Sequence, residues 1–219
     1  GSPDYGKIVG TTRNIINEFK GKNGLSFYLT GGAAVNNAFK EVSEADLKAI
    51  MPLLFIVVLG LLYFIFRSVL AMLLPVVVMS GTIVVTFGIC FYSGFKWGEI
   101  FTILPGIILA ISVADSVHLI VSFFQYKGRG LSNNESIYRS IEKNLIPTFL
   151  TSVSTMIGFF SLMVTELVPL RQFGLLGGVS AGVAWLVTIF LMAPILVLFP
   201  LNPSKIFQKS SDLTKVGKI

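Results

Sequence analysis

Long apolar stretches alternate with short polar segments along most of this chain. Beyond residue 48, runs without charged residues follow one another, and only Asp115 and His118 interrupt the third of them. A helix that crosses the hydrocarbon core of a membrane needs about 20 mostly apolar residues. The pattern therefore predicts a polytopic α-helical membrane protein with five spans. We place them at residues 49–66, 69–93, 101–126, 145–164 and 173–199.

The composition agrees with this class. Hydrophobic residues make up 53% of the chain and charged residues 13%, with a mean hydropathy of +0.80, whereas soluble domains carry roughly 25% charged residues. The single cysteine, Cys90, lies in a predicted span, so neither a disulfide nor a cysteine-based metal site is expected within the chain. ATP-binding, zinc-protease and serine-hydrolase motifs are absent from the sequence. We expect no enzyme activity, no cofactor and no metal.

The first 48 residues are mixed in character and predict a different kind of structure. Residues 4–19 repeat apolar positions at helical spacing, and residues 25–30 alternate like a strand before a turn at residues 31–32. A second helix is predicted at residues 33–42, with Ser43 as the N-cap of the helix that enters the membrane. A lone strand leaves backbone groups unpaired on both edges. We therefore expect the remaining strands to come from outside this sequence.

The basic residues predict the orientation in the membrane. Nine of them follow the first, third and fifth spans, whereas two follow the second and fourth, and short cytoplasmic loops are enriched in Lys and Arg. Residues 1–48 should be extracytoplasmic, and the loop 127–144 and the tail 201–219 cytoplasmic. The amphipathic segment 133–144 should lie along the membrane surface. The net charge of +6 thus reflects topology rather than binding of nucleic acid.

Asp115 is the one acidic residue of eleven in the middle of a predicted span. A carboxylate there costs roughly 2.5–3.5 kcal/mol on insertion scales, so such residues normally face a bundle interior or a water path. Removal from water favours the neutral form of an acid, as a proton carrier requires. Ser112 and Ser122 share a helix face with Asp115, and Ser116 and His118 are close to it in sequence. These residues predict a proton relay of Asp115, Ser116, Ser112 and His118; a structural polar contact between helices, and a packing role for His118, are the alternatives.

The last two spans carry small and hydroxyl-bearing residues at three- and four-residue intervals. In the fourth span they include Thr151, Ser152 and Thr155, which we expect to pack near Asp115 or to line a proton path. In the fifth span they are Gly174, Gly178 and Gly182. Because small residues allow helices to approach closely, the glycines predict a helix-packing surface, with a hinge as the alternative.

Two stretches resemble a known family. Residues 106–119, around Asp115, and residues 28–36 are similar to the resistance-nodulation-division (RND) superfamily, on the branch of MmpL-type lipid exporters, hopanoid transporters, Patched and Dispatched. Members carry a glycine-rich fourth helix with an Asp in a context like G-x-x-x-D; here Ile111 stands at the glycine position. The resemblance covers nearly the whole chain.

The resemblance implies an architecture. A family repeat consists of one helix, a porter domain and five further helices, so the five spans would be the second to sixth helices of one repeat. Residues 1–48 would then be the C-terminal part of an α/β porter domain. A complete member has two repeats, and its proton site pairs polar residues from the fourth helix of each, of which Asp115 would be one. The implied partners are a second repeat or other protomers, membrane lipids and a hydrophobic substrate, in a bacterial inner membrane.

The implied function is export of lipids or other hydrophobic molecules, driven by the proton-motive force through Asp115. Two alternatives stay open. The five helices also resemble a sterol-sensing domain, which would make the chain a lipid-binding or regulatory module without transport. The SecD and SecF subunits of protein export share the superfamily architecture as well. The membrane carboxylate favours transport over sensing, and residues 28–36 argue against an export subunit.

Overall fold

The structure is a computed structural model that describes residues 5–19, 26–94, 100–199 and 201. Its helices are α1 (Tyr5–Phe19), α2 (Gly32–Phe66), α3 (Val69–Tyr92), α4 (Ile100–Gly128), α5 (Asn133–Ser161), the short 3₁₀ helix η1 (Leu162–Val164) and α6 (Val168–Leu198). Five segments are long and apolar enough to cross a membrane: Lys48–Phe66, Val69–Tyr92, Ile103–Gly128, Asn133–Val164 and Leu170–Leu198. The predicted five-helix membrane fold is therefore confirmed.

The chain forms two compact units, residues 1–53 and 54–219. In the first unit, α1 is joined to the first turns of α2 by an ion pair between Arg13 and Glu41, with 2.7 Å between Nη1 and Oε1. Asn37 also donates to Glu41 at 2.7 Å. The hydrogen bond from Arg13, and then the one from Asn37, hold the pKa of the exposed Glu41 carboxyl group below its ordinary value.

Two predictions for this first unit are wrong. Residues 26–30 have no regular secondary structure, and the described residues contain no strand, because no second strand is present to accept and donate the backbone hydrogen bonds. The α/β porter domain is thus not seen. Ser43 does not begin a new helix, since α2 runs without a break from Gly32 to Phe66. The predicted turn before α2 is present, with Gly31 at a φ of +108°.

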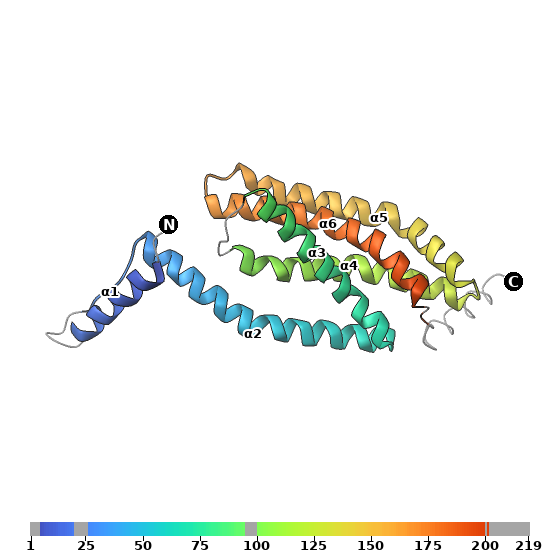
Figure 1. Ribbon diagram of the computed structural model, residues 1–219, viewed down its shortest axis with the longest axis horizontal. Coiled ribbons are helices and arrows are strands. Elements are labelled where there is room, and N and C mark those ends of the chain that lie inside the picture. Colours follow the sequence, from blue (N-terminus) through green and yellow to red (C-terminus); the bar gives the residue numbers. More distant parts are fainter. Residues whose placement is uncertain (1–4, 20–25, 95–99, 200, 202–219) are drawn as a thin grey trace. The chain divides into compact units, whose positions relative to one another are not determined.

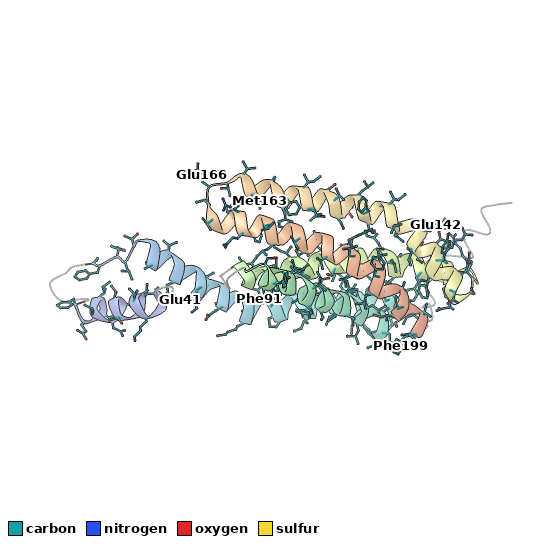
Figure 2. The ribbon with its side chains drawn as sticks, turned by 45° about the horizontal axis from the view of Figure 1, so that its top comes forward. Glu41, Phe91, Glu142, Met163, Glu166 and Phe199 are labelled. Atoms are coloured by element: carbon teal, nitrogen blue, oxygen red, sulfur yellow. The ribbon has the colours of Figure 1, made fainter. Side chains whose placement is uncertain are left out.

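In the second unit, α3, α4, α5 and α6 form a bundle in which α4 contacts each of the other three helices (Figure 1). Short connections make consecutive helices antiparallel. Figure 2 shows the consequence: Phe91, Met163 and Glu166 lie at one end of the bundle, and Glu142 and Phe199 at the other. The first end is the one predicted to be extracytoplasmic.

Apolar side chains fill both ends of the bundle. At the end predicted to be cytoplasmic, α2, α3, α4, α5 and α6 share a core that includes Phe66 and Phe124, whose rings meet edge to face at 5.8 Å. Toward the other end, α3, α4 and α6 share a second core that includes Cys90, Leu104 and Leu176. Polar residues lie between these two cores.

The segment 133–144 is helical, but it is not a separate surface helix. It forms the first turns of α5, which continues to Ser161. Ser132 caps this helix by accepting a hydrogen bond from the Glu135 amide at 3.3 Å. The connection between α4 and α5 is correspondingly shorter than the predicted loop of residues 127–144.

Candidate functional site

Asp115 lies midway along α4 and is 5% exposed. Among the Asp, Glu, Lys, Arg and His side chains that the structure describes, it is the only one that is buried. Its Oδ2 atom has no hydrogen-bond partner within the described residues. The arrangement differs from a buried ion pair, because the described interior provides no cation for the carboxylate.

The groups around Asp115 are hydroxyls. Ser112 and Ser116 precede and follow it on the buried face of α4, and both are fully buried. Their hydroxyl oxygens also lack a hydrogen-bond partner within the described residues. Ser152 of α5 faces the Asp115 carboxyl group and interacts with it. The contact lacks the geometry of an ordinary hydrogen bond, since Ser152 Oγ, like Asp115 Oδ2, has no partner among the described atoms.

A fifth unpartnered oxygen comes from α3. Thr86 Oγ1 is buried, and the described residues provide no hydrogen-bond partner for it. An unpaired buried polar group costs about 1–3 kcal/mol, so such atoms are rare and call for an explanation. We call the five residues with unpartnered oxygens the Asp115 cluster. Its members are Thr86, Ser112, Asp115, Ser116 and Ser152.

The polar residues of the first half of α5 behave differently. Every fourth residue there is buried and polar, and each side chain donates to a backbone carbonyl one turn earlier in the same helix. We call this series the α5 ladder. Its members are Ser136, Ser140, Asn144 and Thr148. Ser152 continues the spacing, but its hydroxyl makes no such bond, so the ladder stops beside Asp115.

Further contacts tie the ladder end of the bundle together. Trp185 of α6 donates to Thr148 Oγ1 at 3.2 Å, and Lys143 Nζ donates to Gln125 Oε1 of α4 at 3.2 Å. Asn133 accepts from Lys127 at 3.2 Å and donates to the Leu196 carbonyl of α6 at 3.0 Å. Polar contacts therefore join α4, α5 and α6 at the predicted cytoplasmic side.

Glycines on α6 allow α5 to lie close beside it. A Cβ atom on Gly178 would overlap the Phe160 ring, and one on Gly174 would lie 2.5 Å from the Phe159 carbonyl oxygen. A Cβ on Gly182 would lie 3.2 Å from Met156 Sδ. These three residues thus contact α5 directly, as a helix-packing surface does. Because α5 carries Ser152, this close contact helps to set its position against α4.

The structure brings together only part of the predicted site. Ser112, Asp115, Ser116 and Ser152 share one buried region, whereas the side chain of His118 is exposed on another face of α4. Thr151 is exposed and Thr155 half-buried, and each donates to a backbone carbonyl of its own helix at 2.8 Å.

Two features were missed by sequence reasoning. Thr86 belongs to the Asp115 cluster but was not singled out, because one threonine in an apolar span carries no signal by itself. The ladder residues Ser136, Ser140 and Asn144 were missed because residues 133–144 were predicted to form a separate amphipathic segment on the membrane surface rather than the first turns of the fourth span. Their spacing of four, continuous with Thr148 and Ser152, is a helical signal that could have revealed them.

Five apolar helices, together with a buried and hydroxyl-lined carboxyl group on the third of them, define a multi-pass membrane protein with an ionisable group at mid-span. Such a group is a common mark of ion and substrate pathways. The family model of the MMPL family matches residues 3–209, and the chain belongs to this family. Its members are RND-type transporters of hydrophobic substrates rather than enzymes, which confirms the resemblance noted in the sequence. No curated protein matches the chain.

Proposed function

We propose that the chain belongs to an exporter of lipids or other hydrophobic molecules that is driven by the proton-motive force, with Asp115 in the proton relay. The observation that carries this proposal is Asp115, a buried carboxyl group in mid-span whose Oδ2 atom has no partner in the described residues. Burial without a counter-charge favours the protonated acid. Approach of a polar or cationic group would favour the carboxylate. A change in helix packing could therefore load and release a proton at this residue.

The second repeat of the transporter is the partner that this site requires. The hydroxyls of the Asp115 cluster can solvate a proton in transit but cannot balance a full negative charge. On α4, the exposed side chains of Ala110, Ala114 and His118 recur every four residues, although α4 is the most buried of the five spans. Small residues permit close helix contact. We propose that the second repeat packs on this face, which would bring His118 into the interior.

The orientation follows from the basic residues. We propose that the loop between α4 and α5 and the C-terminal tail are cytoplasmic in a bacterial inner membrane, and that residues 1–48 are extracytoplasmic. The positive-inside rule supports this orientation. Reporter fusions after Gly130 and after Glu166 test it, because the first should be active as a cytoplasmic reporter and the second should not.

Asp115→Asn in the full-length protein tests the proposed function. Asn keeps the shape of the side chain but cannot release a proton in this range, so both proton flux and export should fall by about 100-fold or more. The control is Glu135→Gln, since Glu135 is exposed and pairs with Arg139 on the same helix. Normal export by a well-expressed Asp115→Asn protein would exclude the proposal. If lipid binding persisted without any proton flux in the unmodified protein, a lipid-sensing module would be the better assignment.

A further inference from the structure

The unpartnered oxygens of the Asp115 cluster are not distributed evenly around Asp115. Ser116 and Ser152 lie at its level. Ser112 lies one turn nearer the N-terminal end of α4, and Thr86 lies in the last third of α3, which runs antiparallel to α4. The two oxygens that do not lie at the level of Asp115, those of Thr86 and Ser112, are therefore both on the side where α3 ends and α4 begins.

Packing places Thr86 beside the half of α4 that precedes Asp115. On α3, Val78, Thr82, Thr86 and Cys90 are buried at intervals of four residues and so share one face. Val78 belongs to the core with Leu119 and Ile120 of α4, and Cys90 to the core with Leu104 and Ile108. Thr86 lies between these two anchors, nearer Cys90, and Ser112 lies between Ile108 and Leu119 on α4.

On the other side of Asp115, toward the predicted cytoplasmic end, the polar side chains are occupied by hydrogen bonds within their own helices. The α5 ladder donates to backbone carbonyls at 2.6–2.8 Å from Ser136 to Thr148. These side chains have no donor hydrogen left for a mobile proton path, with the exception of the second amide hydrogen of Asn144. Thr82, one turn before Thr86 on the same face of α3, is bonded in the same way to the Val78 carbonyl at 2.9 Å.

We infer that Thr86 and Ser112 bind a short chain of water molecules that extends from Asp115 toward the extracytoplasmic end of the bundle, as far as the apolar core around Cys90, Leu104 and Leu176. Thr86 is then a positioning residue for proton entry, and the α5 ladder closes the cytoplasmic side in this conformation. Buried water typically makes two to four hydrogen bonds to polar groups that lack other partners, and the unpartnered hydroxyls provide such groups. The inference rests on the proposed function, because it gives the path by which Asp115 receives its proton.

Cysteine accessibility tests the path without requiring transport. The full-length protein, with Cys90 and any other native cysteine replaced, receives single cysteines and is treated from outside with a small membrane-impermeant methanethiosulfonate. Thr86→Cys and Ser112→Cys should react several-fold faster than the matched variants Thr82→Cys and Thr148→Cys, which lie on the same helix face and in the α5 ladder. Equal reactivity of all four, or no reaction at Thr86→Cys and Ser112→Cys, would overturn the inference.

A second measurement follows proton uptake by proteoliposomes. Thr86→Val removes the hydroxyl but keeps the shape, and should slow uptake by about tenfold, as expected for one lost hydrogen bond to a bridging water. Thr86→Ser should restore the rate, and Thr82→Val should leave it near the unmodified value. Equal losses in Thr86→Val and Thr82→Val would indicate a packing effect and would contradict the inference. A transporter that works normally with Asp115→Asn would instead remove the proposed function and leave the accessibility pattern unchanged.

Discussion

The α5 ladder and the Asp115 cluster are both polar, buried and surrounded by apolar helices, but they treat their polar atoms in opposite ways. In the ladder, each side chain bonds to its own helix. In the cluster, five oxygens lack partners in the described residues. A satisfied polar residue adds little to a helix beyond its packing, whereas an unpaired one costs stability. The difference supports the proposal that the ladder belongs to the scaffold and that the cluster interacts with protons and water molecules.

The contact between α5 and the glycines of α6 allows the strongest test of this comparison, because it holds α5, which carries the ladder and Ser152, in place. Gly178→Ala should destabilise the protein by about 1–3 kcal/mol, since the added methyl group would overlap the Phe160 ring. Gly158→Ala is the matched control, as nothing lies within 4 Å of its Cβ position. Thermal unfolding in lipid nanodiscs measures both. If the two variants had the same melting temperature, the glycine contact between α5 and α6 would not hold α5 in place as proposed.

Removal of one hydroxyl should lower the stability of the protein when the residue lies in the ladder, but not when it lies in the cluster. Thr148→Val takes away the acceptor for Trp185 Nε1 and should cost about 1–3 kcal/mol, because the indole N–H loses its partner. Ser116→Ala removes an oxygen that has no partner among the described atoms, and should leave the melting temperature unchanged or raise it. Chemical or thermal unfolding of the two variants decides the matter. A clear loss of stability in Ser116→Ala would show that its hydroxyl is satisfied after all.

Ser152 separates the two regions most finely, because it keeps the spacing of the ladder but faces Asp115. Ser152→Ala should slow proton uptake by about tenfold with little change in stability, since one polar contact of the carboxyl group is lost. Thr151→Ala is the control, because the neighbouring hydroxyl is exposed and bonded to the Thr148 carbonyl. Proton uptake by proteoliposomes measures the effect. Equal rates in the two variants would place Ser152 in the ladder.

The membrane fold could be predicted from the sequence because each span is defined by its own composition. Hydrophobic runs gave all five spans, and the structure extends them by continuing helices into polar flanks, as α5 does from Asn133. Asp115 and Ser152 were also within reach, since a carboxylate in a span is conspicuous and Ser152 has helical spacing with its neighbours.

The remaining features depend on contacts between distant segments. Nothing in the sequence near Thr86 shows that its hydroxyl lacks a partner whereas that of Thr82 bonds to Val78. The exposure of His118 likewise depends on which face of α4 meets the other helices. The strand at residues 25–30 was predicted from local alternation, but a strand forms only where another strand can pair with it.

The smallest expected effect concerns Glu41, whose carboxylate is exposed and paired, in contrast to the buried and unpaired carboxyl group of Asp115. Arg13 and Asn37 hold the pKa of Glu41 below its ordinary value. A lowered pKa in the folded state means that the contact between α1 and α2 is fully stabilised above the ordinary carboxyl pKa of about 4.3 and weakens as the pH falls through the lowered one. Glu41→Gln should remove this acid sensitivity and leave only a slight loss at neutral pH, because salt and water screen an exposed pair.

Hydrogen exchange of the α1 amides, corrected for the intrinsic effect of pH, measures this difference between pH 3 and pH 7. Glu44→Gln is the control, since Glu44 lies on the same helix outside the Arg13–Glu41 pair. Protection of α1 should fall in acid for the unmodified protein and for Glu44→Gln, but should stay level for Glu41→Gln. Identical acid profiles for all three proteins would mean that the ion pair does not hold α1. The exposed Glu41 carboxylate would then take up a proton only below the ordinary pH range of a carboxyl group. Asp115 contrasts with it, because its proposed role requires protonation at the pH at which the transporter works.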